Sequence, residues 1–254
     1  MLKKDLNGKN ILITGSSRGI GASIALIAAE RGANVVINYR NKEKRALSVG
    51  RQARAYGSKA ILVQADLTNS SDLDNIFSNI KAEYNKLDVL ILNASGGLEK
   101  GKDDNYALKL NRDAQVEMVN RSVKLMKAGS KIVFVTSHLA HFYGEKPIIP
   151  GYEPIAKSKK AGENALREMI PELEEKGISL IIVSGDLIEG TITPKLFERA
   201  SPGLIERRRQ QAGALPTTQE FASVIVDAVA DQEIKTGSTI YVGETDWDLQ
   251  IALS

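Results

Sequence analysis

The chain has 254 residues, 43% of them hydrophobic, which is long and apolar enough to bury one large α/β core. The formal net charge of +3 is mild and does not by itself indicate nucleic-acid binding, and the absence of cysteine excludes disulfides and cysteine-ligated zinc. With two histidines, no apolar run of about 18 residues and a short charged N-terminus unlike a signal peptide, we expect no metal site, no membrane span and a cytoplasmic location.

The first predicted strand, Asn10–Thr14, runs into a glycine-rich turn. The turn reads Thr14-Gly-Ser-Ser-Arg-Gly-Ile-Gly21, and a helix with apolar periodicity follows from Ile20 to Arg31. The first N–H groups of a helix have no intrahelical partners and its dipole favours an anion, while glycines let the backbone come close to a pyrophosphate. Strand, turn and helix in this order predict a phosphate-binding site rather than an ordinary loop.

Apolar runs and helical stretches then alternate almost to the end of the chain. Six more strands are predicted, at Asn34–Asn38, Ala60–Gln64, Leu87–Leu92, Lys131–Thr136, Ile178–Val183 and Thr239–Val242. Helices are predicted near 42–56, 71–85, 104–127, 154–175 and 218–231. Such alternation is typical of parallel strands with right-handed crossovers and helices on both faces. We predict one α/β domain over residues 1–254, a Rossmann-like doubly wound fold with a seven-stranded parallel sheet, and a substrate loop or lid near 185–217.

The pattern Thr14-Gly-x-x-x-Gly-x-Gly21 resembles the cofactor motif of the short-chain dehydrogenase/reductase family. Further features of that family follow in order over nearly the whole chain, after successive predicted strands. They imply a dinucleotide held by Gly15, Ser17, Arg18, Gly19, Ile20, Gly21, Asp66, Leu67, Asn93, Ala94, Ser95, Lys159 and Gly185, and catalysis by Asn111, Ser137, Tyr152 and Lys159. The resemblance also implies a homotetramer.

The end of the second predicted strand bears on the choice of cofactor. It reads Val35-Val-Ile-Asn-Tyr-Arg40 and lacks the carboxylate that would bond the ribose hydroxyls of NAD. Arg18 and Arg40 offer guanidinium groups that suit a phosphate, although either side chain could simply be solvated. The missing acid and the two bases favour NADP(H). The family resemblance implies that Asp66 bonds the adenine, and a loop acid resembling a helix cap is the alternative.

The predicted catalytic helix departs from the usual family pattern, in which a tyrosine stands four residues before the lysine. Ile155 occupies that position relative to Lys159, and the nearest tyrosine is Tyr152, seven residues ahead. Pro154 is tolerated only in the first turn of a helix, so we expect the helix to begin near it and Tyr152 to lie just outside. Tyr152 and Lys159 can then converge on one cleft.

This spacing resembles the enoyl-thioester reductase branch of the family, some bacterial members of which also carry a segment similar to Asn93-Ala-Ser-Gly96. The glycine turn resembles the ketoreductase pattern instead. In either case hydride transfer from the nicotinamide builds negative charge on a substrate oxygen, which a tyrosine hydroxyl can protonate. A nearby ammonium favours the phenolate and so lowers the pKa of that tyrosine. By resemblance Lys159 also holds the nicotinamide ribose, Asn111 supports a water chain, and Ser137 orients a carbonyl, with a turn serine as its alternative.

Several side chains near the cleft have less defined roles. By resemblance Tyr143 is a candidate substrate contact. His138 and His141 could shuttle protons or act as hydrogen-bonded spacers. In the predicted lid, Arg199, Arg207, Arg208 and Arg209 either present cations to a phosphate of coenzyme A or an acyl carrier protein, or form a solvated helix face.

Three functions stay open from the sequence. The first is an NADP(H)-dependent reductase of a carbonyl or a conjugated enoyl compound, including acyl thioesters. The second is a dehydrogenase of an unrelated alcohol. The third is a catalytically silent NADP-binding scaffold or sensor, in which Ile155 marks a lost tyrosine. Small molecules are the expected partners in all three, with neither nucleic acid nor membrane.

Overall fold

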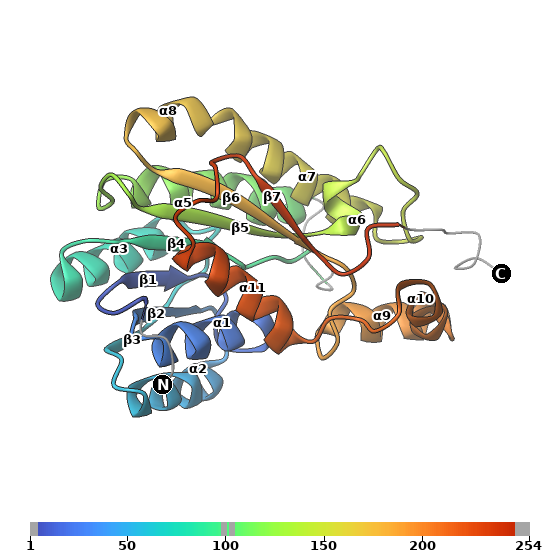
Figure 1. Ribbon diagram of the computed structural model, residues 1–254, viewed down its shortest axis with the longest axis horizontal. Coiled ribbons are helices and arrows are strands. Elements are labelled where there is room, and N and C mark those ends of the chain that lie inside the picture. The colour runs from blue at the N-terminus through green and yellow to red at the C-terminus, as the bar shows by residue number, and fades with distance from the viewer. Residues whose placement is uncertain (1–4, 98–100, 102–104, 247–254) are drawn as a thin grey trace.

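The computed structural model describes residues 5–97, 101 and 105–246. Seven parallel strands form one sheet in the order β3-β2-β1-β4-β5-β6-β7 (Figure 1). The predicted α/β fold with a seven-stranded parallel sheet is therefore confirmed. The strands are β1 Asn10–Ile13, β2 Asn34–Tyr39, β3 Ala60–Gln64, β4 Val89–Leu92, β5 Lys131–Ser137, β6 Ser179–Gly185 and β7 Thr239–Val242.

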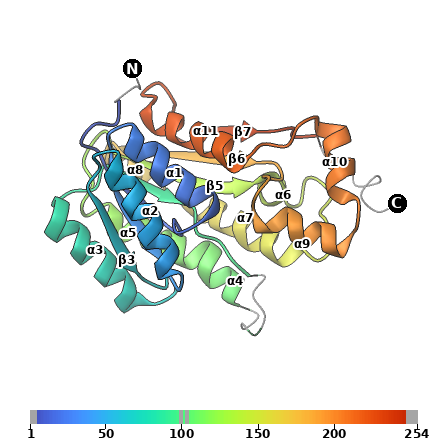
Figure 2. The same ribbon diagram turned by 90° about the horizontal axis from the view of Figure 1, so that it is seen from below.

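Helices cover both faces of the sheet, as Figures 1 and 2 show. One face carries α1 Gly19–Glu30, α2 Glu43–Ala55 and α11 Thr218–Ala230. The other carries α3 Ser70–Tyr84, α5 Ala114–Ser122, α7 Glu153–Glu168 and α8 Ile170–Glu175. A short helix, α4 Tyr106–Leu108, and a π-helical turn, η1 Lys109–Asp113, lead directly into α5.

Alternation along the strands explains this layering. Ile11 and Ile13 of β1 belong to the core cluster under α1 and α11, whereas Leu12 belongs to the cluster under α3 and α5. Because both faces of the sheet are covered, the strands read in the sequence as continuous apolar runs. Helix ends follow local rules: Thr217 and Glu220 form a capping box at the start of α11.

The stretch 185–217, predicted as a substrate loop or lid, contains two helices. These are α9 Ile192–Ala200 and α10 Leu204–Ala212, which lie together beyond the end of the sheet (Figure 2). A third apolar cluster joins them to α7 and to the short helix α6 His138–His141, which was also not predicted. The segment therefore has a packed core of its own, and Phe197 and Leu204 belong to it.

The order of the strands fixes where a ligand can bind. β1 lies between β2 and β4, so the chain reverses its direction of winding there, and the crevice at the carboxyl ends of β1 and β4 is the expected ligand site. Within the described ranges, no helix is long and apolar enough to cross a membrane. Nor do those residues bring three potential metal ligands together.

Candidate active site

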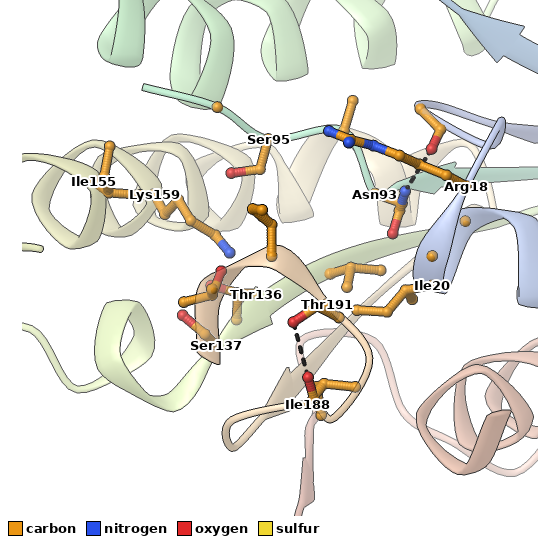
Figure 3. Close-up of a pocket in the computed structure, with 18 of the residues that line it drawn as sticks. Arg18, Ile20, Asn93, Ser95, Thr136, Ser137, Ile155, Lys159, Ile188 and Thr191 are labelled. Carbon is orange, nitrogen blue, oxygen red and sulfur yellow. Dashed lines mark hydrogen bonds between the residues drawn. The ribbon is translucent and has the colours of Figure 1, made fainter. Parts of the chain in front are cut away.

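A cavity of about 850 Å³ opens at the carboxyl ends of the strands. The β1–α1 turn, the ends of β2 to β6, α7 and the α9 region line it. Every residue predicted to bind the cofactor lies in this lining, and so do Ser137, Tyr152 and Lys159. Asn111 and Tyr143 are not among the lining residues. In Figure 3, Lys159 extends into the cavity from α7 on one side and Arg18 lies on the other.

Hydrogen bonds to neighbouring strands and loops fix the position of the glycine turn. The N–H of Gly15 donates to Asn38 Oδ1 at 3.0 Å, and the Thr14 hydroxyl accepts the N–H groups of Asn93 and Ala94 at 2.9 Å each. A Cβ at Gly21 would lie 2.6 Å from Asn93 Nδ2, so a side chain there would push β4 and α1 apart. Among the residues that the structure describes, no side chain caps α1 at Arg18, which leaves the helix N-terminus facing the cavity as an anion site.

Basic side chains surround the cavity at the end of β2. Arg18 and Arg40 were predicted there, whereas Lys42 and Arg45 are additional. Arg40 donates to the Tyr106 hydroxyl and lies 3.8 Å from Asp66, measured from Nη1 to Oδ2. Arg40 was predicted as a phosphate ligand with a solvated side chain as the alternative, and in the structure it already has partners at this rim.

Asn111 supports the cavity wall from behind. Its Oδ1 accepts the Ser95 hydroxyl at 3.0 Å and the Gly96 N–H at 3.2 Å. Its Nδ2 donates to Gly96 O at 2.8 Å and to the Ser158 hydroxyl at 2.9 Å. These four hydrogen bonds fix the loop after β4 against α7. The water chain implied by resemblance stays a prediction.

Tyr152 occupies the N-cap position of α7, as expected from Pro154. Its side chain is buried, with a residue exposure of 5%, and lines the cavity together with Lys159. The Phe197 ring of α9 packs edge-on against it, with 5.2 Å between ring centroids. Ile155, in the position where the family pattern has a tyrosine, lines the cavity as an apolar wall.

Burial sets the electrostatics of this pair. It lowers the pKa of Lys159 to about 8, and the negative charge of Glu163 opposes that change. Burial raises the pKa of the Tyr152 hydroxyl, and the Ser137 hydroxyl acts in the opposite direction. Ser137 Oγ has no hydrogen-bond partner among the described residues, although it lies close enough to the Tyr152 hydroxyl to lower its pKa.

Three consecutive side chains where β5 leads into α6 carry buried polar atoms without a hydrogen-bond partner in the described part of the chain. They are Thr136 Oγ1, Ser137 Oγ and His138 Nε2, and all three residues line the cavity. Figure 3 shows Thr136 and Ser137 at the lower edge of the space that Lys159 enters. Buried polar groups are normally satisfied, so these atoms indicate a polar ligand or ordered water in the cavity.

The two histidines sit in α6 and are hydrogen-bonded. His138 Nδ1 lies 2.8 Å from Ser184 Oγ, and burial lowers the pKa of His138 to about 4, so it is neutral near pH 7. His141 contacts Glu163 and Tyr241 and does not line the cavity. The geometry thus favours the spacer interpretation over a proton shuttle.

Tyr143, a candidate substrate contact by resemblance, lies outside the cavity lining. Its hydroxyl donates to Glu153 Oε1 at 3.0 Å, at the start of α7. Tyr143 also packs against the apolar cluster that contains Tyr152 and Leu187, and its contact with a substrate stays a prediction.

The arginines of 195–211 do not act as one group. Arg208 is buried and pairs with buried Asp186 at 2.8 Å, so neither a phosphate-presenting nor a solvated role fits it. It also donates to the backbone oxygens of Glu244 and Asp246. Arg209, in contrast, pairs with Glu189 on the surface. The lid side of the cavity combines apolar side chains with the polar Thr191, Thr193 and Lys195. The apolar ones are Leu187, Ile188, Ile192 and Leu196, which the sequence analysis did not identify.

Known proteins resemble this chain in sequence and fold. A family model for short chain dehydrogenases matches residues 9–200. Hydroxynaphthalene reductase arp2 from Aspergillus fumigatus is 31% identical over 206 residues, covering 78% of this chain and 73% of that protein. A short chain dehydrogenase from Burkholderia cenocepacia J2315, solved in complex with NADP, is 27% identical with a TM-score of 0.81, over 94% of this chain and 97% of that one.

A 7α-hydroxysteroid dehydrogenase, solved with NADH and 7-oxo glycochenodeoxycholic acid, is 26% identical with a TM-score of 0.82, over 98% of this chain and 100% of that one. Solved relatives therefore bind NADP in one case and NADH in the other. With its glycine turn, sheet order and matched residues, the chain belongs to the short-chain dehydrogenase/reductase family and is an NAD(P)-dependent oxidoreductase.

Proposed function

We propose that this protein is an NADP(H)-dependent reductase that transfers hydride to the carbonyl group of an apolar small molecule. The observation that carries this proposal is the meeting of Ser137, Tyr152 and Lys159 in one cavity with the glycine turn. Hydroxynaphthalene reductase arp2 and the steroid dehydrogenase with its oxo ligand, both similar to this chain, support a carbonyl substrate.

The residues present fit a dinucleotide with a 2′-phosphate. The uncapped start of α1 and the close approach at Gly21 suit a pyrophosphate. Lys42 and Arg45 are exposed at the rim beside Arg18, in the place where a carboxylate would select NAD. This cluster supports NADP(H) as the cofactor.

The bound nicotinamide supplies the hydride, and the chain supplies the proton and the orientation. Ser137 Oγ, buried and unpartnered among the described residues, can donate a hydrogen bond to the substrate carbonyl. The Tyr152 hydroxyl donates its proton to the oxygen as negative charge develops there. The ammonium of Lys159 lowers the cost of the resulting phenolate. Leu187, Ile188 and Ile155 exclude water from the reacting carbon.

Reduction of a conjugated enoyl thioester is the second candidate. The seven-residue offset from Tyr152 to Lys159 favours it, because this spacing resembles the enoyl-reductase branch. The place of Ile155 in the cavity wall is compatible with both reactions. The distinction therefore rests on which oxygen, ketone or enolate, the Tyr152 hydroxyl protonates.

The test is NADPH oxidation with three substrates at equal concentration: a fused-ring aromatic ketone, a 3-oxoacyl thioester and a 2-enoyl thioester. We expect preferential turnover of a ketone, reduced about 10²- to 10⁴-fold by Tyr152→Phe, because that variant removes the proton donor. Tyr56→Phe, an exposed tyrosine at the end of α2, is the matched control and should leave turnover unchanged.

Preferential enoyl turnover that is lost in Tyr152→Phe would replace the first candidate by the second. Oxidation of an alcohol with NADP⁺, without reduction of any of the three compounds, would favour the unrelated dehydrogenase. NADPH binding without any turnover would favour the silent scaffold.

A further inference from the structure

A buried carboxylate lies one helical turn behind Lys159, and the proposed mechanism does not use it. Glu163 follows Lys159 by four residues in α7, so the two side chains share a face of the helix. The Glu163 side chain is 1% exposed, and Lys159 is buried too. A carboxylate in such a place is costly unless it is paired and hydrogen-bonded, so its presence requires an explanation.

Two side chains hold Glu163 in its charged form. Arg167 Nε donates to Oε1 at 2.9 Å, and His141 Nδ1 lies 2.9 Å from Oε2. Burial alone would raise the pKa of Glu163, but the hydrogen bonds and charges of His141 and Arg167 outweigh it and lower that pKa. The carboxylate is therefore a fixed negative charge at neutral pH.

Both partners are themselves anchored. His141 Nε2 lies 2.9 Å from the Tyr241 hydroxyl, and Lys160 donates to the backbone oxygen of His141. Each ring nitrogen of His141 thus has a hydrogen-bond partner, Glu163 on one side and Tyr241 on the other. Arg167 donates to Gly237 O at 2.8 Å and to Thr239 Oγ1 at 2.7 Å. Residues from α6, α7 and the β7 region thus fix one carboxylate behind the active-site lysine.

We propose that Glu163, held by His141 and Arg167, is a positioning residue whose buried negative charge keeps the Lys159 ammonium protonated during turnover. This inference rests on the proposed function for its catalytic consequence, but not for its effect on Lys159. Burial already brings the pKa of Lys159 down to about 8, and Glu163 opposes that fall. Without the carboxylate, Lys159 would lose its proton at a lower pH and would no longer stabilise a Tyr152 phenolate.

The test measures the protonation of Lys159 directly, in Glu163→Gln. Trace labelling with acetic anhydride over a range of pH, with mass spectrometry of the modified peptide, reports the fraction of neutral amine at Lys159. We expect the labelling midpoint, near 8 in the unchanged protein, to fall by about one pH unit or more. Glu168→Gln, the same change at an exposed position of α7, is the matched control and should leave the midpoint in place.

The alkaline limb of the pH profile of kcat/KM for NADPH oxidation should move down by the same amount. An unchanged labelling midpoint in folded Glu163→Gln overturns the inference, whatever the activity. A lowered midpoint with an unmoved alkaline limb overturns the catalytic consequence. A lowered midpoint in a protein that oxidises no NADPH with any substrate contradicts the proposed function and leaves the charge assignment standing.

If Glu163→Gln does not fold, Glu163→Gln combined with Arg167→Met removes the unpaired cation as well. The double variant also lacks the Glu163 carboxylate that opposes the fall in the pKa of Lys159, so a downward shift of the midpoint is expected from it too. A midpoint like that of the unchanged protein would again overturn the inference.

Discussion

Lys42 and Arg45 lie at the cavity rim, where they differ from Arg40, whose side chain has structural contacts. Arg40 binds the Tyr106 hydroxyl and lies beside Asp66, so its removal would disturb the wall of the cavity. Lys42 and Arg45 are exposed there, which makes them the better probes of cofactor choice.

We expect Lys42→Ala and Arg45→Ala each to lower the preference for NADPH over NADH about tenfold, since a charge-assisted hydrogen bond to a phosphate contributes about 1.5–3 kcal/mol. The measurement is kcat/KM with both cofactors. Arg51→Ala, on the same helix but outside the lining, should keep the ratio. An equal loss with NADPH and NADH would show that the side chains do not contact the 2′-phosphate.

Single residues differed in how well the sequence predicted them. Tyr152 was placed correctly outside its helix because Pro154 restricts where α7 can begin. The sequence could not show that Arg208, rather than Arg207 or Arg209, is buried, because a run of three arginines does not reveal which side chain points inward. Its partner Asp186 lies at the end of a distant strand, so only the fold brings the two together.

At the scale of elements, α7 and η1 approach each other unusually closely. A Cβ built on Gly162 would lie 1.9 Å from the backbone oxygen of Asn111. That contact presses the helix carrying Lys159 against the turn carrying Asn111. The π-helical turn itself gave no signal in the apolar pattern, where 104–127 read as one helix.

Gly162→Ala should therefore destabilise the fold by about 1–3 kcal/mol, as overpacking does, although alanine normally stabilises a helix interior by about 1 kcal/mol over glycine. Urea unfolding measures the change. Gly50→Ala in α2 is the comparison, because its new Cβ would meet only the end of the flexible Leu62 side chain. Equal effects of the two substitutions would contradict the role given to the α7–η1 contact.

The Asp186–Arg208 pair joins α10 to the end of β6. We expect Arg208→Met to cost about 3–5 kcal/mol, because it leaves the Asp186 carboxylate buried without a counter-ion. Arg209→Met, which removes only a surface ion pair, should cost under about 1 kcal/mol. The loss of unfolding free energy in each variant is measured from its denaturant midpoint, provided that the m-value is unchanged. A loss in Arg208→Met no larger than in Arg209→Met would refute the anchoring role.

At the scale of the whole molecule, most of the fold could be predicted from periodicity, since a doubly covered parallel sheet leaves long apolar runs in the sequence. The bounds of α9 and α10 could not be predicted because Pro194, Pro202 and Gly203 break the apolar pattern, and these helices are stabilised by packing on the apolar cluster that contains Tyr152. The apolar side chains of the lid that line the cavity were not identified either. The homotetramer stays a prediction, and light scattering can test it.

The way Arg208 is bound also has a consequence for how this protein can vary. Its guanidinium reaches the main-chain oxygens of Glu244 and Asp246, which every amino acid supplies. The side chains that follow β7 can therefore be substituted with little effect on the hydrogen bonds of Arg208. An insertion or deletion between Val242 and Asp246 would instead move those oxygens out of reach. The length of the loop after β7, more than the identity of its residues, therefore determines whether Arg208 stays anchored.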